Sequence, residues 1–190
     1  MDALFKSQEE FARYVRLHFA RQDIGDVGVF SGMTVLRVMR AAVLRVMRFL
    51  RDDPACRFTQ LTDACCVHYP DRPDCFELNY FLLSPLMKRR LRLVCATQED
   101  VAVASVCPVF PNAAWYEREM WEMFGVAFEN HPDMRRLLLP DDMSGHPLRK
   151  DARPPDRLVY DETKGRFVRQ KRENGRQAVL FGVDLNRRDA

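Results

Sequence analysis

Three glutamates crowd one short stretch of the sequence. Glu117, Glu119 and Glu122 lie close together, with a single arginine, Arg118, among them. Paired carboxylates can act as general acid and base, so catalysis is the first chemistry to consider here. On a helix, however, Arg118 and Glu122 are four residues apart and can form an ion pair. We therefore expect a solvated helix face at these acids, and no catalytic residue on this chain.

Two histidines follow, His131 and His146. Histidine is a common zinc ligand, but a zinc site needs three or four protein ligands, and the sequence places no third ligand near this pair. A metal-dependent hydrolase is therefore a weak alternative. We expect both histidines to be hydrogen-bonding loop residues.

The cysteines are scattered. None of the six forms a C-x-x-C pair, the spacing typical of zinc and iron–sulfur sites. The phosphate-binding patterns G-x-G-x-x-G and G-x-x-x-x-G-K are missing as well. The sequence thus predicts no cofactor and no metal on this chain, and reduced core thiols in a reducing compartment. The six are Cys56, Cys65, Cys66, Cys75, Cys95 and Cys107.

The helices and loops that carry these acids and histidines are predicted to be short. Residues 113–124 have helical apolar spacing, and Gly125 is placed to end the helix in a left-handed conformation. Pro132 suits the first position of a second, short helix that Pro140 ends. A compact loop follows at 141–151. Prolines and glycines make this segment rigid, which favours fixed ion pairs, either within the chain or across a polar interface with another subunit.

The first fifty residues predict two helices. Residues 5–21 are amphipathic, and Ser7 with Glu10 resembles a capping box. Residues 34–51 show the strongest amphipathic pattern, with Thr34 as its cap, arginines on one side and apolar side chains on the other. This stretch contains the hexapeptide VLRVMR twice, at 35–40 and 43–48. We expect a core-facing helix; a helix lying on an anionic membrane is the alternative.

After these helices, the apolar residues recur at the two-residue spacing of β-strands. Residues 76–83 and 90–95 alternate, with a break at Ser84-Pro85 that predicts a hairpin. Residues 56–66 form a weaker strand, joined to the next by the turn at 70–74. A short helix is expected near 98–105. Together these elements predict an α+β fold, with N-terminal helices packed on a small antiparallel sheet, then a short-helix and loop segment.

Composition limits the remaining choices. The chain has 190 residues, which suits one domain at 1–150 with an extended tail at 151–190 laid on partner subunits. No apolar run is long enough to span a membrane. The acids of the N-terminus argue against a targeting peptide. Of 30 basic residues, 25 are arginines, a composition typical of polar interfaces but also of nucleic-acid binding.

The spacing in the second half resembles a known family. Its signature is matched by Glu117-Arg118-Glu119, by Glu122-Met123-Phe124, and then by His131, Arg135, Leu137 and Leu138. A second hallmark is matched by residues 145–151, GHPLRKD, and the strand region by 69–77 and 90–94. The sequence is similar here to the 30 kDa subunit of respiratory complex I, over roughly residues 56–151. Its length resembles the mitochondrially encoded form of that family.

The resemblance implies a cofactor-free scaffold in the peripheral arm of an NADH:ubiquinone oxidoreductase. FMN, iron–sulfur clusters and ubiquinone would then belong to the rest of the complex. The implied partners are the 49 kDa quinone-site subunit and neighbouring iron–sulfur subunits, and the implied place is the matrix side of the mitochondrial inner membrane, or the cytoplasmic side in bacteria. The implied signature and interface residues are Glu117, Arg118, Glu119, Glu122, His131, Arg135, Arg136, His146, Arg149, Lys150 and Asp151.

An arginine-rich RNA-binding module is the alternative from another class. The stretch Gly25-Asp26-Val27-Gly28 imitates the loop of KH domains, but its aspartate would repel phosphate. Acids also interleave the arginines, and no aromatic RNA-binding signature is present. Steeply salt-dependent RNA binding would support this alternative.

Overall fold

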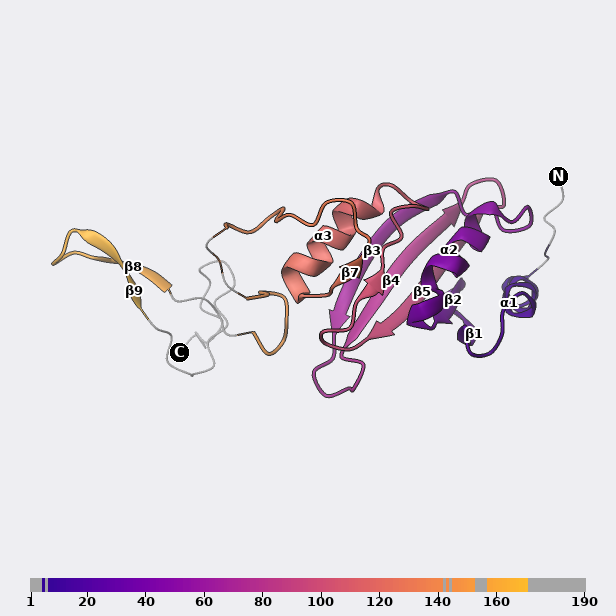
Figure 1. Cartoon of the computed structure of the whole chain (residues 1–190), viewed down its shortest axis with the longest axis horizontal. Helices are drawn as coiled ribbons and strands as arrows, with labels where there is room; N and C mark the ends of the chain where they lie inside the picture. Colours follow the sequence, from indigo (N-terminus) through magenta and orange to yellow (C-terminus); the bar gives the residue numbers. More distant parts are fainter. Residues whose placement is uncertain (1–4, 6, 142, 144, 153–156, 171–190) are drawn as a thin grey trace, which may run out of the picture. The chain divides into compact units, whose positions relative to one another are not determined.

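The computed structural model describes residues 5, 7–141, 143, 145–152 and 157–170. The chain divides into two units, Met1–Ala152 and Arg153–Ala190, and each is described by itself. Figure 1 shows the order of elements in the first unit. They are α1 (Gln8–Leu17), β1 (Ile24–Phe30), β2 (Met33–Val38), η1 (Arg40–Ala42), α2 (Val43–Asp52), β3 (Gln60–His68), β4 (Phe76–Ser84), β5 (Arg89–Thr97), β6 (Val103–Ala104), α3 (Ala113–Phe124) and β7 (Phe128–Glu129).

The main sheet has five strands in the order β1-β2-β5-β4-β3. The expected hairpin between β4 and β5 is confirmed, as is the antiparallel pairing of β3 with β4. The prediction of a small antiparallel sheet was incomplete, because β1 and β2 add two strands and β2 runs parallel to β5. The glycine-rich stretch that imitates a KH loop lies inside β1.

The repeated hexapeptide adopts two different structures. Its first copy forms most of β2, whereas its second copy begins α2. The prediction of one helix over 34–51 was therefore wrong in its first half. In β2, Leu36 and Val38 are buried and alternate with the exposed Arg37; in α2, Val43, Val46 and Met47 are buried at helical spacing. Both copies place apolar side chains in one core, each with the period of its own element.

The first helix is confirmed, with shorter bounds than expected. The Ser7 side chain accepts a hydrogen bond from the Glu10 backbone N–H at 3.2 Å, as half of a capping box would. Phe11, Ala12 and Val15 are its buried residues. Thr34, expected as a helix cap, is instead a buried strand residue whose hydroxyl donates to Gln8 of α1.

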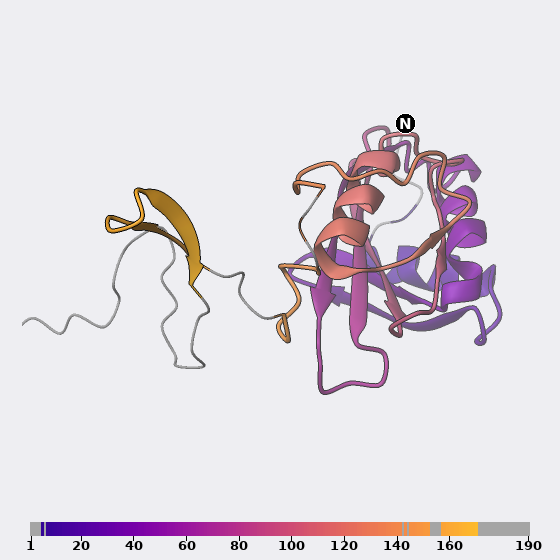
Figure 2. The same cartoon turned by 60° about the vertical axis from the view of Figure 1, so that its left-hand side comes forward.

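The core lies on one face of the sheet. Phe11 of α1, Val46 and Leu50 of α2 and Met120 of α3 all belong to one cluster of buried side chains with the strands. Figures 1 and 2 show α2 and α3 over the same face of the sheet. All three helices of the described chain therefore contribute to a single core, which fixes α3 at the end of the sheet that β3 forms.

Two expected short helices are not formed. Residues 98–105 contain only the short strand β6, which pairs in parallel with β7. The described residues from 130 to 152 contain no helix or strand, so Pro132 does not begin a helix. In both places, tertiary hydrogen bonds to distant residues replace those of a local helix.

The second unit contains a hairpin. Strands β8 (Arg157–Asp161) and β9 (Arg166–Gln170) pair antiparallel, and the Asp161 side chain accepts hydrogen bonds from Thr163 and Lys164 in their turn. The rest of the expected tail, at 153–156 and 171–190, lies outside the described residues. Among the described residues, no helix is both long and apolar enough to cross a membrane.

All six cysteines are free thiols. Four are buried as expected: Cys56, Cys66, Cys75 and Cys95. Cys107 is half-buried, and Cys65 is exposed on β3, which corrects the prediction that all of them lie in the core.

Candidate functional site

The charged segment 115–151 begins on α3, and the chain fixes this helix at both ends. Asn112 precedes it, and its side-chain amide donates to the carbonyl of Leu61 on β3 at 2.8 Å. The Tyr116 hydroxyl donates to the neighbouring carbonyl of Thr62. Gly125 ends the helix as predicted, with φ of +84°. The helix therefore lies along the edge of β3 and satisfies two of its free carbonyls.

Glu117 is fully buried against the core, which corrects its expected place on a solvated face. One carboxylate oxygen accepts the backbone N–H of Val106 at 2.8 Å, and the other accepts the Cys107 thiol at 3.5 Å. Burial raises the pKa of Glu117, against hydrogen bonds that favour its charged form. Burial also raises the pKa of Cys107 to about 11, so this thiol stays protonated at neutral pH.

His131 completes this buried group. Its Nδ1 accepts the Asp133 backbone N–H at 3.0 Å, so the ring proton must sit on Nε2, which donates to the carbonyl of Ala114 at 3.1 Å. His131 is therefore neutral in this geometry, and its 4.0 Å approach to Glu117 is not an ion pair.

The buried group does not suit a metal ion. Cys107, Glu117 and His131 bring one possible ligand atom each to within 4.8 Å of one another, so a third candidate ligand does lie near His131, contrary to the sequence argument. His146 is not part of the group. Both ring nitrogens of His131 already hold backbone partners, which leaves no lone pair for a metal. The group fits a hydrogen-bonded core cluster rather than a metal centre.

The opposite side of α3 holds an irregular stretch of backbone. The Arg118 guanidinium donates to the carbonyls of Arg135 and Arg136 at 2.8 and 2.7 Å. The Glu122 carboxylate accepts three successive backbone N–H groups, those of residues 137–139, at 2.8 to 3.0 Å. The expected pair between Arg118 and Glu122 is therefore wrong, because each side chain binds backbone of 135–139 instead.

Glu122 is also buried, with a residue exposure of 2%. Burial raises its pKa, but the three backbone N–H donors and the nearby Arg136 outweigh burial, so the pKa of Glu122 lies below its ordinary value. Glu117 and Glu122 thus shift in opposite directions. Glu119 alone of the three remains on the exposed side.

The loop after residue 140 folds back over the end of α3. The His146 Nδ1 lies 2.9 Å from the carbonyl of Glu122, and the Leu148 backbone N–H donates to the carbonyl of Met123. The His146 ring covers Gly125 so closely that a Cβ there would lie 2.7 Å from it. Arg136 donates to the carbonyl of Met143 at 2.8 Å. These contacts pin the loop to the helix.

The last residues of the segment bind the sheet. Arg149 forms a two-pronged ion pair with Asp151 at 3.0 Å, pairs with Glu99 at 2.5 Å, and lies over the Phe76 ring. Hydrogen bonds from Arg149 lower the pKa of Asp151 to about 2. The Lys150 backbone N–H donates to buried His68 at 3.1 Å, and its ammonium lies over the Tyr69 ring.

Most of the predicted site residues are therefore brought together, but seldom as ion pairs. Arg135 pairs with Asp133 at the surface, and Arg149 pairs with two acids. Asp151 is one of these two acids, Lys150 lies over the Tyr69 ring and Glu119 is exposed, whereas the side chains of the remaining site residues bind backbone. Sequence reasoning missed Cys107, Glu99 and His68, whose partners lie 10, 50 and 82 residues away in the chain. No local spacing marks them.

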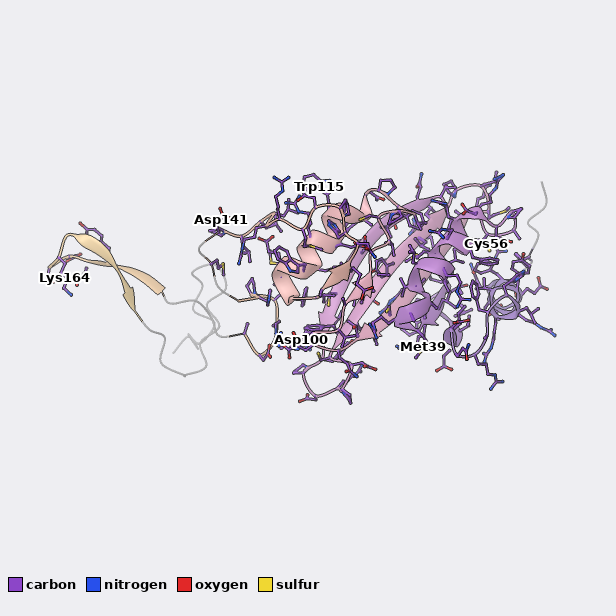
Figure 3. All side chains as sticks on the ribbon, viewed as in Figure 1. Met39, Cys56, Asp100, Trp115, Asp141 and Lys164 are labelled. Carbon is purple, nitrogen blue, oxygen red and sulfur yellow. The ribbon has the colours of Figure 1, made fainter. Side chains whose placement is uncertain are left out.

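Large apolar side chains lie exposed on the same segment. Trp115, Leu138 and Leu148 are 61%, 59% and 53% exposed, and Figure 3 shows Trp115 at the outer surface of α3. The Arg118 guanidinium lies 5.5 Å from the Trp115 ring. The buried charges thus hold a framework that presents apolar groups to solvent.

Known proteins are similar to this chain in sequence and in fold. The family described as respiratory-chain NADH dehydrogenase, 30 Kd subunit, matches residues 36–157. The NADH-quinone oxidoreductase C subunit of Parvibaculum lavamentivorans is 51% identical, over 73% of this chain and 70% of that protein. The protein of the same name from Bartonella henselae is 41% identical, over 77% and 72%.

Two solved structures have a fold similar to that of this chain. A trypsin-resistant fragment of Nqo5 has a TM-score of 0.53 and 27% identity, covering 66% of this chain and 97% of the fragment. One polypeptide of the membrane-bound sulfane sulfur reductase, an archaeal respiratory membrane complex, has a TM-score of 0.64 at 23% identity, covering 75% and 84%, and shows the shared fold alone. The family match spans most of the sheet and the whole charged segment. The chain belongs to the family of the 30 kDa subunit of the respiratory-chain NADH dehydrogenase.

Proposed function

We propose that this chain is a non-catalytic scaffold in the peripheral arm of respiratory complex I. It supports electron transfer from NADH to ubiquinone by holding the 49 kDa quinone-site subunit and neighbouring iron–sulfur subunits in place. Family membership and the names of its relatives, which are subunits of an oxidoreductase, support this proposal. Those relatives are bacterial; a mitochondrial location remains a prediction.

One observation carries the proposal: three charged side chains of the family-matched segment bind its own backbone, while three of its large apolar side chains are exposed. Arg118, Glu122 and Arg136 bind the segment's own backbone. Irregular backbone held in this way is pre-organised, so little ordering remains when a partner binds. Exposed Trp115 is the kind of aromatic anchor that contributes most to the binding energy of protein interfaces, and the exposed Leu138 and Leu148 add apolar area to the same segment.

The positions of the three glutamates of α3 argue against a catalytic role for them. Glu117 and Glu122 have exposures of 0% and 2%, and each carboxylate is already engaged by backbone N–H groups. A general acid or base must reach the proton that it transfers, and neither carboxylate can reach a substrate in solution. Glu119 is exposed but stands without a second acid of α3 beside it on that face.

The C-terminal unit fits the same role. Residues 151–190 are proposed to lie along partner subunits. The β8–β9 hairpin within them presents Tyr160, which is 52% exposed.

Surface variants test the scaffold without disturbing the fold. Leu138→Asp combined with Leu148→Asp places charges on exposed apolar positions of the segment. The matched control is Leu86→Asp, at a 57% exposed leucine in the turn between β4 and β5. We expect both proteins to unfold at the same denaturant concentration as the parent, while only the double variant fails to co-purify with the 49 kDa subunit in mild detergent.

Two results would contradict the proposal. One is a double variant that enters the complex as well as the control does. The other is a fully assembled complex that has lost electron transfer, because a pure scaffold acts only through assembly.

A further inference from the structure

The sheet has a second face, opposite the core. Alternate residues of the strands point to it, and the register aligns Arg37 with Val94 and Asn79 with Cys65 across four strands. The core cluster, to which the three helices of the described chain contribute, lies on the other side. We call this second side the open sheet face and define it by Val35, Arg37, Cys65, Glu77, Asn79, Phe81, Leu83, Arg92 and Val94.

Of the apolar residues of the open sheet face, Val94 is buried, whereas three others do not join the core. Val35, Phe81 and Leu83 are half-buried and lie outside the core cluster and outside the apolar residues packed against it. A monomer gains nothing from apolar groups gathered on a face that its own helices leave uncovered. Such groups, placed among fixed charges, are typical of a protein interface.

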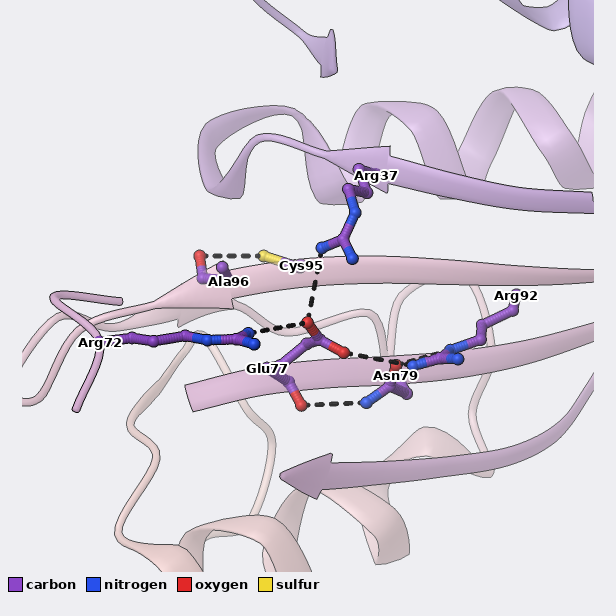
Figure 4. Close-up of polar contacts among 7 residues, drawn as sticks. All are labelled: Arg37, Arg72, Glu77, Asn79, Arg92, Cys95 and Ala96. Atoms are coloured by element: carbon purple, nitrogen blue, oxygen red, sulfur yellow. Dashed lines mark hydrogen bonds and ion pairs between the residues drawn. The ribbon is translucent and has the colours of Figure 1, made fainter. Parts of the chain in front are cut away.

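A fixed charge cluster joins β2, β4 and β5 on this face (Figure 4). The Glu77 carboxylate, in a residue 6% exposed, lies 3.2 Å from Arg92, 3.4 Å from Arg37 and 3.9 Å from Arg72. The Asn79 side chain accepts from Arg92 at 2.8 Å and donates to the carbonyl of Glu77. These bonds hold the guanidinium of Arg92 against the sheet.

The cluster carries more positive than negative charge. Three guanidiniums surround one carboxylate, and the side chains of Arg37 and Arg72 are 54% and 57% exposed. Each keeps donors free toward solvent, because a guanidinium has five N–H groups and Glu77 engages few of them. A carboxylate of a partner can meet such donors with two parallel hydrogen bonds.

We propose that the open sheet face docks an acidic protein surface of a neighbouring subunit, with partner carboxylates on Arg37 and Arg72 and apolar side chains on Val35, Phe81 and Leu83. This rests on the proposed function, since it takes the neighbour from the same complex. It names a second surface, separate from the segment 115–151.

A natural reporter lies on this face. Cys65 is the exposed cysteine of the chain and is the strand partner of Asn79. Its alkylation by N-ethylmaleimide, followed by mass spectrometry, is compared between the isolated full chain and the assembled complex. Fully buried Cys56 is the internal control in both. We expect Cys65 to react at least about tenfold more slowly in the complex.

Charge variants test the chemistry of the partner. Arg37→Glu with Arg72→Glu should restore most of the Cys65 reactivity in the complex, whereas Arg37→Lys with Arg72→Lys should retain at least part of the protection. The matched control is Arg13→Glu with Arg16→Glu, at exposed arginines of α1, which should leave the protection unchanged.

Several outcomes would overturn the inference. They are equal reactivity in the complex and the isolated chain, protection that survives charge reversal, protection lost on nuclease treatment, and protection of the isolated chain that grows with its concentration, which would indicate a second copy. A chain that never co-purifies with redox partners contradicts the proposed function as well. An assembled complex with freely reactive Cys65 contradicts this inference alone.

Discussion

The two buried glutamates of α3 should respond in opposite ways to the same substitution. Glu122→Gln keeps the shape of the side chain but removes its charge and turns one oxygen into an amide. That amide must face a backbone N–H, because the carboxylate accepts from Leu137 and Leu138 on one oxygen and from Leu139 on the other. The glutamine can satisfy two donors at most, and the third is left facing another donor.

The magnitude follows from these contacts. A hydrogen bond to a charged group contributes about 1.5–3 kcal/mol and a neutral one about 0.5–1.5 kcal/mol. Two bonds weaken and the third is lost, while relief from burying a charge offsets part of the loss. We expect Glu122→Gln to lower the free energy of unfolding by about 2–4 kcal/mol. In a domain of this size, each kcal/mol shifts Tm by roughly 2–4 °C.

Glu117→Gln should differ because burial raises the pKa of Glu117 and so disfavours its charged form. The side-chain oxygen of the glutamine can still accept the hydrogen bond from the Val106 backbone N–H. Only the weaker contact with the Cys107 thiol then changes. We expect a change of less than about 1 kcal/mol in the free energy of unfolding at pH 7. Glu119→Gln, at the exposed position of the same helix, is the surface control.

Glu117 and Glu122 should also differ in how their contributions to stability depend on pH. The pKa of Glu122 is lower in the folded chain, so its stabilising effect is present above its unfolded pKa of about 4.5 and is lost as pH falls through the lower folded value. The pKa of Glu117 is higher in the folded chain. Its contribution is therefore full below its unfolded pKa of about 4.5 and is lost as pH rises through the folded value.

Denaturant unfolding of the full chain, followed by tryptophan fluorescence, measures these effects from neutral pH down to acidic solution well below the unfolded pKa of about 4.5. The parent should lose its advantage over Glu122→Gln toward the acid end of the range. Equal losses for Glu117→Gln and Glu122→Gln at neutral pH, or a Glu122→Gln deficit that does not shrink in acid, would refute the assignment of the charge to Glu122.

The remaining predictions concern single contacts. Gly125→Ala should lower the free energy of unfolding by more than about 2 kcal/mol, because it combines a φ of +84° with a Cβ only 2.7 Å from the His146 ring, and combining it with His146→Ala should recover part of that loss in the same assay. Arg149→Ala should reduce assembly on native gels, because it breaks pairs with Glu99 and Asp151; activity per assembled complex should stay unchanged, and a loss there would contradict a structural role. Since the pKa of Asp151 is lowered to about 2, that pair should persist into mildly acidic solution.

The elements that were predicted correctly are those whose pattern determines the structure locally. Residues 113–124 repeat at helical spacing and end at a glycine, and 76–84 alternate beside a turn; both have the expected type. The buried glutamates were misplaced for a physical reason. Their partners are backbone N–H groups of Val106 and of residues 137–139, which have no side-chain identity for a sequence pattern to show.

The repeated hexapeptide shows most clearly what local sequence cannot predict. Its two copies are identical, so intrinsic propensity cannot distinguish them, yet one is a strand and the other a helix. The first copy lies between β1 and β5, where neighbours on both sides complete its backbone hydrogen bonds. The second copy pairs with no strand of the described chain, so its backbone hydrogen bonds close within the helix while Val43, Val46 and Met47 are buried.

The strand conformation of the first copy also creates the open sheet face. In the strand, Arg37 points away from the core and reaches Glu77; in the helix, the equivalent Arg45 pairs with Asp23 instead. Had both copies been helical, as their pattern predicts, β2 would be missing and the sheet would lose both β1 and the guanidinium that Arg37 supplies. A strand that local sequence does not specify must therefore be stabilised by its neighbours. Substituting Leu36 or Leu93, which pair across β2 and β5 in the core, should affect the charge cluster on the other face as well.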